Sequence, residues 1–150
     1  MRNGWARLMA SGVLVACLLG TVAETAGADT LLRRERMLGW VNHARHESGV
    51  RSLDLGWRLT SIARDHSRAM AKQDRLFHST SLSAKLSFAN WNTWGENVGA
   101  GMDAWGLYRA FMKSPDHRRN MLEGRFRRVG IGFVRDDADR ILWVTMVFYG

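Results

Sequence analysis

The chain has 150 residues, of which 46% are hydrophobic, and a single proline. This length and composition fit one compact domain with its own core, and they argue against a second domain, a linker or a low-complexity tail. The formal net charge of +8 favours anionic partners, namely nucleic acid, anionic lipid or an acidic cell-wall polymer, although it also fits a solvated basic face. Much of this charge lies in arginines late in the chain: Arg118, Arg119, Arg125, Arg127 and Arg128.

The first 28 residues have the pattern of a secretory signal peptide. Arg2 and Arg7 precede an uncharged apolar run over residues 8–20, and Ala26-Gly27-Ala28 is a small-residue cleavage pattern. The run is short for a membrane span, and it lacks the apolar stripe of a helix that packs in a globular domain. We therefore expect residues 1–28 to be removed and residues 29–150 to form a secreted or periplasmic domain. Export argues against nucleic acid as a partner.

Cys17 leaves a second interpretation of this segment open. Leu14-Val15-Ala16-Cys17 has the form of a bacterial lipoprotein box, in which Cys17 would be acylated and would anchor the protein to a membrane. The apolar run continues past the cysteine, which argues against this alternative. Because Cys17 is the only cysteine, an exported domain must be stabilised by packing without disulfides.

Two segments after the expected cleavage point have helical periodicity. The first helix should run from a cap at Asp29-Thr30 to a stop at Gly49, and the second should open at Thr60 or Ser61. The residues that recur at helical spacing, and form the stripe of each helix, are Met37, Leu38, Val41, Ala44 and Arg45, then Leu59, Ile62, Ala63, His66, Ala69 and Met70. His66 falls on the second stripe, so we interpret it as a core histidine with a hydrogen-bond partner.

The remaining elements change from helices to strands. Asp103 can cap a third helix, and Ser114-Pro115 starts a fourth, since serine caps helices and proline favours their first position. Apolar residues then alternate from Val129, and residues 141–149 are rich in aromatic and β-branched side chains, which predicts an antiparallel hairpin. Helices first and strands last indicate an α+β fold, with a sheet covered by helices.

Two histidines and one acid are the candidate site residues. His117 lies on the first turn of the fourth helix, where the helix dipole favours a neutral ring that can ligate a metal or accept a proton. Glu96 lies in the glycine-rich segment of residues 95–101, whose glycines permit close backbone approach or a tight turn. A partly buried Glu96 needs a partner, for which His78 is the candidate. His43 and His46 have metal-ligand spacing but no third ligand nearby.

These motifs together resemble the CAP superfamily, which comprises the cysteine-rich secretory proteins, antigen 5 and the plant pathogenesis-related proteins. The bacterial SCP-like branch is the most similar, and the lack of disulfides agrees with it. The resemblance covers nearly all of residues 31–150 and implies an α-β-α sandwich with a central antiparallel sheet. It rests on Met37-Leu38, Val41-Asn42, Ala44-Arg45, Gly49, Leu53, Leu59, Ala63, His66, Met70-Ala71, His78-Ser79, Gly95-Glu96-Asn97, Ser114-Pro115-Asp116-His117-Arg118 and Val129-Gly130-Ile131-Gly132.

The resemblance also implies a central cleft, which binds a divalent metal in some members. Its histidines would be His78 and His117 and its acid Glu96, and these three are the expected metal ligands. Asn97 and Ser114 are the other expected cleft residues. The chain departs from the family where other members place a second acid after an aromatic residue, because Ser114 follows Phe111 here. Asp116 is a substitute for that acid, but on the second helical position we expect it to face solvent.

Two classes of function follow from this site. Two histidines and a carboxylate suffice for zinc with an open position, which would suit a metal-dependent hydrolase acting on peptide or cell-wall substrates. The same three side chains could instead form a hydrogen-bonded network that ties the helices to the sheet. Glu96 cannot easily be both ligand and general base. A serine mechanism is not supported, because Ser79 should point away from His78 and Ser114 should be occupied as a cap.

Aromatic residues near the Gly-Glu-Asn motif suggest a binding function instead. They could wall an apolar groove, stack on sugar or simply pack in the core. They are Phe88, Trp91, Trp94, Trp105 and Tyr108. Since some members of the CAP superfamily bind lipid or sterol, we expect a secreted or cell-envelope binding module for a lipid-like or cell-envelope ligand, with a cleft that can hold a divalent metal such as zinc. The metal-dependent hydrolase is the alternative.

Overall fold

The computed structural model describes residues 12–136, 138 and 140–150. It divides into two units, Met1–Leu32 and Arg33–Gly150. Helix α1 (Gly12–Glu47) contributes to both. Arg2, Arg7 and the side chain of Cys17 lie outside the described part, and cleavage after Ala28 stays a prediction. Among the helices that the structure describes, none combines the length and apolar content needed to cross a membrane.

The start of α1 differs from the prediction. We expected a helix start at Asp29-Thr30, but α1 is continuous through both residues. The physical reason is that residues 21–36 contain no proline and are rich in alanine, leucine and arginine, which favour helix. The end of α1 is as predicted, because Gly49 follows it with a φ of 68°, a backbone conformation that glycine adopts without strain.

The sheet has the strand order β1-β3-β4-β2. Its strands are β1 (Asp54–Leu55), β2 (Trp94–Gly101), β3 (Arg128–Asp136) and β4 (Ile141–Tyr149). The predicted hairpin of β3 and β4 is confirmed, and β2 also pairs with β4 in antiparallel orientation. The sheet is not wholly antiparallel, because the two-residue strand β1 runs parallel to β3. The glycine-rich segment forms strand β2 and not a tight turn, but the expected close approach is confirmed, since a Cβ atom at Gly99 would lie 2.9 Å from Cζ of Phe111.

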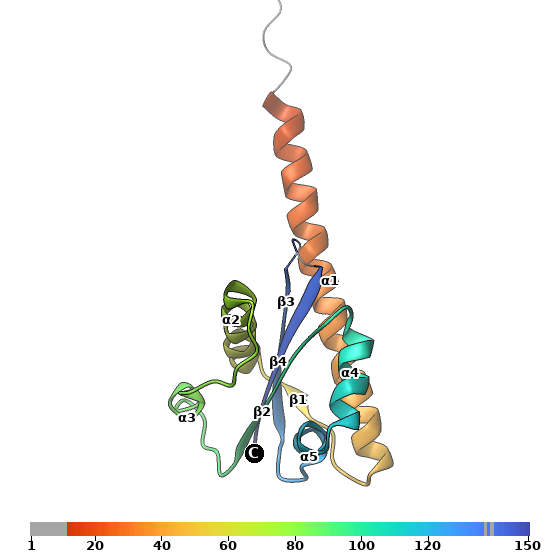
Figure 1. Cartoon of the computed structure of the whole chain (residues 1–150), viewed down its shortest axis with the longest axis vertical. Helices are drawn as coiled ribbons and strands as arrows, with labels where there is room; N and C mark the ends of the chain where they lie inside the picture. Colours follow the sequence, from red (N-terminus) through yellow and green to blue (C-terminus); the bar gives the residue numbers. More distant parts are fainter. Residues whose placement is uncertain (1–11, 137, 139) are drawn as a thin grey trace, which may run out of the picture. The chain divides into compact units, whose positions relative to one another are not determined.

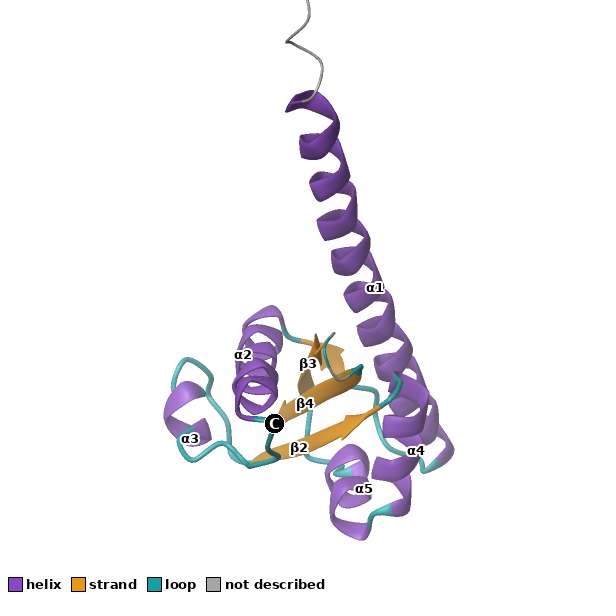
Figure 2. Cartoon of the chain, turned by 45° about the horizontal axis from the view of Figure 1, so that its top comes forward, coloured by secondary structure: helices purple, strands orange, loops and turns teal. Residues whose placement is uncertain are grey.

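Helices cover both faces of the sheet, as Figures 1 and 2 show for residues 33–150. On one face lie α2 (Trp57–Gln73) and the short helix α3 (Leu82–Lys85). On the other lie α4 (Ala104–Lys113), α5 (Pro115–Leu122) and residues 33–47 of α1. Alternating side chains of β4 build a core on each face: Leu142, Val144, Met146 and Phe148 pack toward α1 and α4, whereas Trp143 and Val147 pack toward α2. The predicted α-β-α sandwich is confirmed.

Two glycines of β3 let α2 lie directly on the sheet. A Cβ atom at Gly130 would lie 2.1 Å from the carbonyl carbon of Leu59, and one at Gly132 would lie 2.1 Å from the backbone nitrogen of Arg64. Any larger residue would therefore push α2 away. The contact is reinforced by the buried Ser67 hydroxyl, which lies 2.9 Å from both the Gly132 carbonyl oxygen and the Thr145 hydroxyl.

The helix starts are partly as predicted. Asp103 caps α4, since its Oδ1 accepts the Gly106 N–H at 2.8 Å. Helix α2 begins at Trp57, earlier than the predicted Thr60 or Ser61, because Gly56 is already held by β3 through its N–H bond to the Val129 carbonyl oxygen. Helix α5 begins with proline as predicted, but the Ser114 hydroxyl makes no capping hydrogen bond.

Candidate functional site

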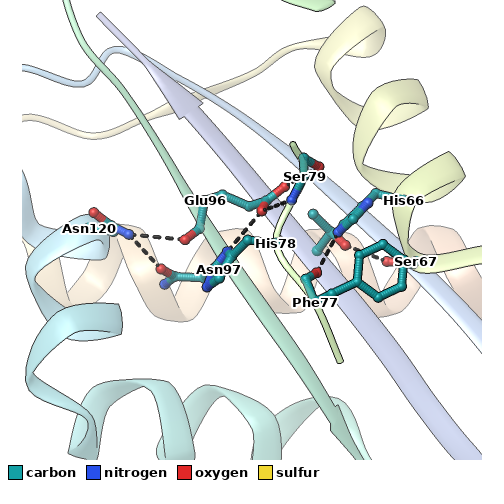
Figure 3. A network of polar contacts seen from close by, with 9 residues as sticks. His66, Ser67, Phe77, His78, Ser79, Glu96, Asn97 and Asn120 are labelled. Carbon is teal, nitrogen blue, oxygen red and sulfur yellow. Dashed lines mark hydrogen bonds and ion pairs between the residues drawn. The ribbon is translucent and has the colours of Figure 1, made fainter. Parts of the chain in front are cut away.

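The carboxylate of Glu96 is the centre of a polar network at the edge strand β2 (Figure 3). Glu96 is 7% exposed. Its Oε1 accepts from His78 Nδ1 and from the Ser79 backbone N–H, both at 2.9 Å, and its Oε2 accepts from the Ser79 hydroxyl at 2.6 Å. The predicted partnership of His78 with Glu96 is confirmed. These three hydrogen bonds replace bonds to water and so offset the cost of burying the carboxylate.

The position of Ser79 corrects an expectation. We predicted that Ser79 and His78 would point in opposite directions, but both side chains reach Glu96. The reason is that these residues lie in a loop before α3, where the alternation of an extended strand does not apply. Because the Ser79 hydroxyl donates to Glu96, the imidazole of His78 is not its proton acceptor. A serine nucleophile is therefore still unsupported.

The ring of His78 faces solvent beyond this network. Its side chain is 63% exposed, although its Nδ1 is bound to Glu96. A carboxylate oxygen is an acceptor, so the hydrogen-bond network assigns a proton to Nδ1 and leaves Nε2 outside the network. Among the described residues, none forms a hydrogen bond with Nε2 of His78.

His117 lies on the first turn of α5, half-buried against the ring of Phe111 with ring centroids 4.9 Å apart. Burial lowers the pKa of His117, and the charge of His78 lowers it further, while Asp116 opposes both effects. The lowered pKa agrees in direction with the predicted preference for a neutral ring, but its largest cause is burial and not the helix dipole on which the prediction rested. The effect of His78 also shows that the two imidazoles are electrostatic neighbours.

Two asparagines attach α5 to β2: Asn97 follows Glu96 on β2, and Asn120 lies on α5. Asn97 is fully buried, donates through Nδ2 to the His117 carbonyl oxygen at 2.9 Å and accepts through Oδ1 from Asn120 Nδ2 at 2.9 Å. Asn120 Nδ2 also lies 3.1 Å from the Glu96 carbonyl oxygen. Asn97, expected in the cleft, is thus a positioning residue that fixes the turn bearing His117. Asn120 was missed, and the available signal was its i+3 spacing from His117 on one helical face.

The other candidate residues have structural or surface roles. Ser114 is half-buried between α4 and α5, and Asp116 is exposed and paired with Arg119 at 2.7 Å, as predicted for solvent. The core role of His66 is confirmed, since its Nε2 lies 2.8 Å from the Phe77 carbonyl oxygen (Figure 3). Among the described residues, no group of three or more His, Cys, Asp or Glu side chains is placed to hold a metal ion. The expected three-ligand set is not such a group.

The aromatic residues near the Gly-Glu-Asn motif do not form one groove. Trp105 and Tyr108 pack with Trp40 on the α1 and α4 side of the sheet. Trp91 packs against the Leu82 and Leu86 cluster on the opposite side. These rings are close in sequence, but α4 carries Trp105 and Tyr108 to one side of the sheet while Trp91, which precedes β2, packs on the other.

The fold and the ordered motifs define a class: an α-β-α sandwich with a histidine pair next to the Gly-Glu-Asn strand. The chain belongs to the CAP family, since the model of the cysteine-rich secretory protein family matches residues 38–148. No curated protein matches the chain in sequence.

Solved structures share the fold. An outer surface protein of Borrelia burgdorferi has a TM-score of 0.73 and 14% identity, with 80% of this chain and 93% of that chain covered. An extracellular protein containing an SCP domain from Bacillus anthracis has a TM-score of 0.67 and 22% identity, with 77% of this chain and 39% of that chain covered. A cysteine-rich secretory protein of Staphylococcus aureus also has a TM-score of 0.67 and 22% identity, with 80% of this chain and 38% of that chain covered. The chain thus spans well under half of the latter two proteins.

Proposed function

We propose that this CAP domain is an exported binding module whose cleft, formed by His78 and His117 in front of Glu96, holds a small ligand through its imidazoles or through a divalent metal such as zinc. The similar structures are those of outer surface, extracellular and secretory proteins, which supports export. The location is outside the cell or in the periplasm, with acylation of Cys17 as the alternative that would anchor the protein to a membrane. A lipid-like or other cell-envelope component is the partner we expect.

The engagement of Glu96 is the observation on which this proposal rests. All three donors around its carboxylate come from His78 and Ser79, so the acid orients the imidazole and both of its oxygens are already hydrogen-bonded. Imidazoles that bind metals commonly donate their other N–H to a carboxylate in this way. The lowered pKa of His117 favours the neutral form that ligation requires.

We propose that a divalent metal would be held by the two imidazoles and not by the set of three ligands that we predicted. His78 and His117 would supply nitrogen ligands of the type that zinc prefers, and Glu96 would lie behind His78 as its orienting partner. Such a metal would act as a Lewis acid with coordination positions left for donor atoms of the ligand. The site is thereby suited to holding an oxygen-bearing group.

The metal-dependent hydrolase remains the second candidate, because open coordination positions also suit catalysis. It would need a general base able to take a proton from the attacking water. Glu96 is buried and committed to His78 and Ser79, and the exposed Asp116 is paired with Arg119. The binding module therefore accounts better for the arrangement of these side chains.

Calorimetric titration of the purified full chain with zinc tests the proposal. We expect His78→Ala and His117→Ala each to weaken zinc binding at least about hundredfold with little change in unfolding, because each removes a ligand and neither ring fills the core. Glu96→Gln should weaken binding about tenfold to hundredfold through loss of the orienting partner. The matched control is His43→Ala, an exposed histidine paired with Glu47 on α1.

Unchanged zinc affinity in both cleft variants would refute the metal-binding form of the proposal. Turnover of peptides or cell-wall fragments that is lost in Glu96→Gln and depends on zinc would establish the hydrolase instead.

A further inference from the structure

One end of the sheet gathers exposed aromatic rings and cations. The strand register places Asp54, Arg128, Tyr149 and Trp94 in one row across the sheet, next to the C-terminal residue marked in Figure 1. Helix α2 starts beside this row. Here Trp57 is 80% exposed, Trp94 40% and Phe88 36%. We call this surface the aromatic-basic end; it comprises Trp57, Arg58, Lys85, Phe88, Trp94, Arg125, Arg127 and Arg128.

A groove of about 300 Å³ lies on this surface between the start of α2 and α3. Its lining contains no acid and consists of Trp57, Arg58, Ser61, Ile62, Lys85 and Phe88. The guanidinium carbon of Arg58 lies 4.1 Å from the centroid of the Phe88 ring and 5.9 Å from that of Trp57. The groove thus combines an apolar floor with two cations.

The charge of the aromatic-basic end is positive after its acids are counted. Asp54 lies 4.0 Å from Arg128, and Glu123 pairs with Arg125 at 2.9 Å. Arg58, Lys85 and Arg127 have no ion pair with a described carboxylate. Two of these cations, Arg58 and Lys85, line the groove together with the rings of Trp57 and Phe88, which favours an anionic partner that can also accept apolar groups.

The arrangement of the rings favours a lipid surface over an acidic sugar polymer. A sugar ring would stack on an aromatic face, but the face of Phe88 is already covered by Arg58. Trp57 instead projects into solvent from the first turn of α2, as interfacial tryptophans do at membrane surfaces. Basic residues beside such rings contact anionic headgroups.

We propose that the aromatic-basic end docks onto an anionic phospholipid bilayer, with Trp57 and Trp94 entering the interface and with Arg58 and Lys85 binding the phosphate of a headgroup seated in the groove. This surface shares no residue with the cleft of His78 and His117. The inference therefore stands or fails independently of the proposed function.

The test is partitioning of the full chain onto vesicles of phosphatidylcholine alone and onto vesicles of equal parts phosphatidylglycerol and phosphatidylcholine. Comparing variants of one chain keeps the contribution of residues 1–28 constant. The double variant Arg58→Gln, Lys85→Gln should lower the anionic-to-neutral binding ratio about 25-fold, since each cation near an anionic surface contributes about fivefold. Trp57→Ala should weaken binding to the anionic vesicles about tenfold.

The matched control removes two cations from the opposite end of the sheet, at the β3–β4 turn, in the double variant Arg135→Gln, Arg140→Gln. Its ratio should stay within about twofold of the unmodified chain. Charge reversal in Lys85→Glu, an exposed site whose folding can be checked by circular dichroism, should lower the ratio further than Lys85→Gln. An equal loss in the control, or an unchanged ratio in Arg58→Gln, Lys85→Gln, would overturn the proposal. So would a preference for a soluble acidic polysaccharide that the same variant abolishes.

Discussion

Replacing Gly132 with alanine should destabilise the domain by more than about 3 kcal/mol, a large share of the roughly 5 to 15 kcal/mol that ordinarily holds a domain folded. The new methyl group would lie 2.1 Å from the backbone nitrogen of Arg64 and 2.3 Å from the carbonyl carbon of Ala63. Neither atom belongs to a side chain that can rotate away, so α2 would have to leave the sheet. The hydrogen bond from the buried Ser67 hydroxyl to the Gly132 carbonyl oxygen would be lost as well.

Urea denaturation followed by circular dichroism measures this effect. Gly124→Ala is the matched control, because a Cβ atom at Gly124 meets nothing within 4 Å. A loss below about 1 kcal/mol for Gly132→Ala would contradict the close packing of α2 on β3.

Replacing Arg45 with methionine should cost about 3 to 5 kcal/mol of folding free energy. Arg45 is fully buried, and its guanidinium donates to the carbonyl oxygens of Arg51, Met121, Glu123 and Phe126 at 2.7 to 3.2 Å. Methionine has a similar length but no donor, so these acceptors would lose their partner within the protein. Burial and the charge of Arg127 lower the pKa of Arg45, and the four acceptors compensate the buried charge.

The same substitution should weaken ligand binding at the cleft, because Arg45 anchors the C-terminal end of the helix that bears His117. Chemical denaturation and zinc titration of Arg45→Met measure the two effects. Arg51→Met, at an exposed neighbouring position, should change stability by less than about 0.5 kcal/mol. Equal effects of the two substitutions would show that the carbonyl contacts contribute little.

Periodicity predicted the long elements and missed the short or glycine-rich ones. The stripes of α1, α2 and α4 and the alternation in β3 and β4 are strong because each element buries one continuous face. Strand β2 was missed, since glycines interrupt its pattern and its stability comes from pairing with β4. Strand β1 and helix α3 are too short to show any period. The predicted start of α1 was wrong, because Asp29-Thr30 was interpreted as a helix cap although neither glycine nor proline adjoins this pair.

The site was predictable where a residue's own chemistry demands a partner. A buried Glu96 needs a donor, so its partnership with His78 followed from one residue. The lowered pKa of His117 was expected from the helix dipole, but burial, which depends on tertiary packing, is its largest cause. The role of Ser79 depends on a loop conformation, and those of Asn97 and Asn120 depend on how α5 meets β2. Such contacts arise from tertiary packing, which no local pattern encodes.

A pH titration of the His117 ring by NMR tests most directly whether the two imidazoles form one site. Burial and the charge of His78 both lower the pKa of His117 from its usual 6.5, so its midpoint should lie below that value, and zinc affinity should fall as the pH drops through the midpoint. His78→Gln should raise the midpoint while burial keeps it below 6.5, and the exposed His46→Gln should leave it unchanged. A midpoint at or above 6.5, or the same midpoint with and without His78, would contradict the account.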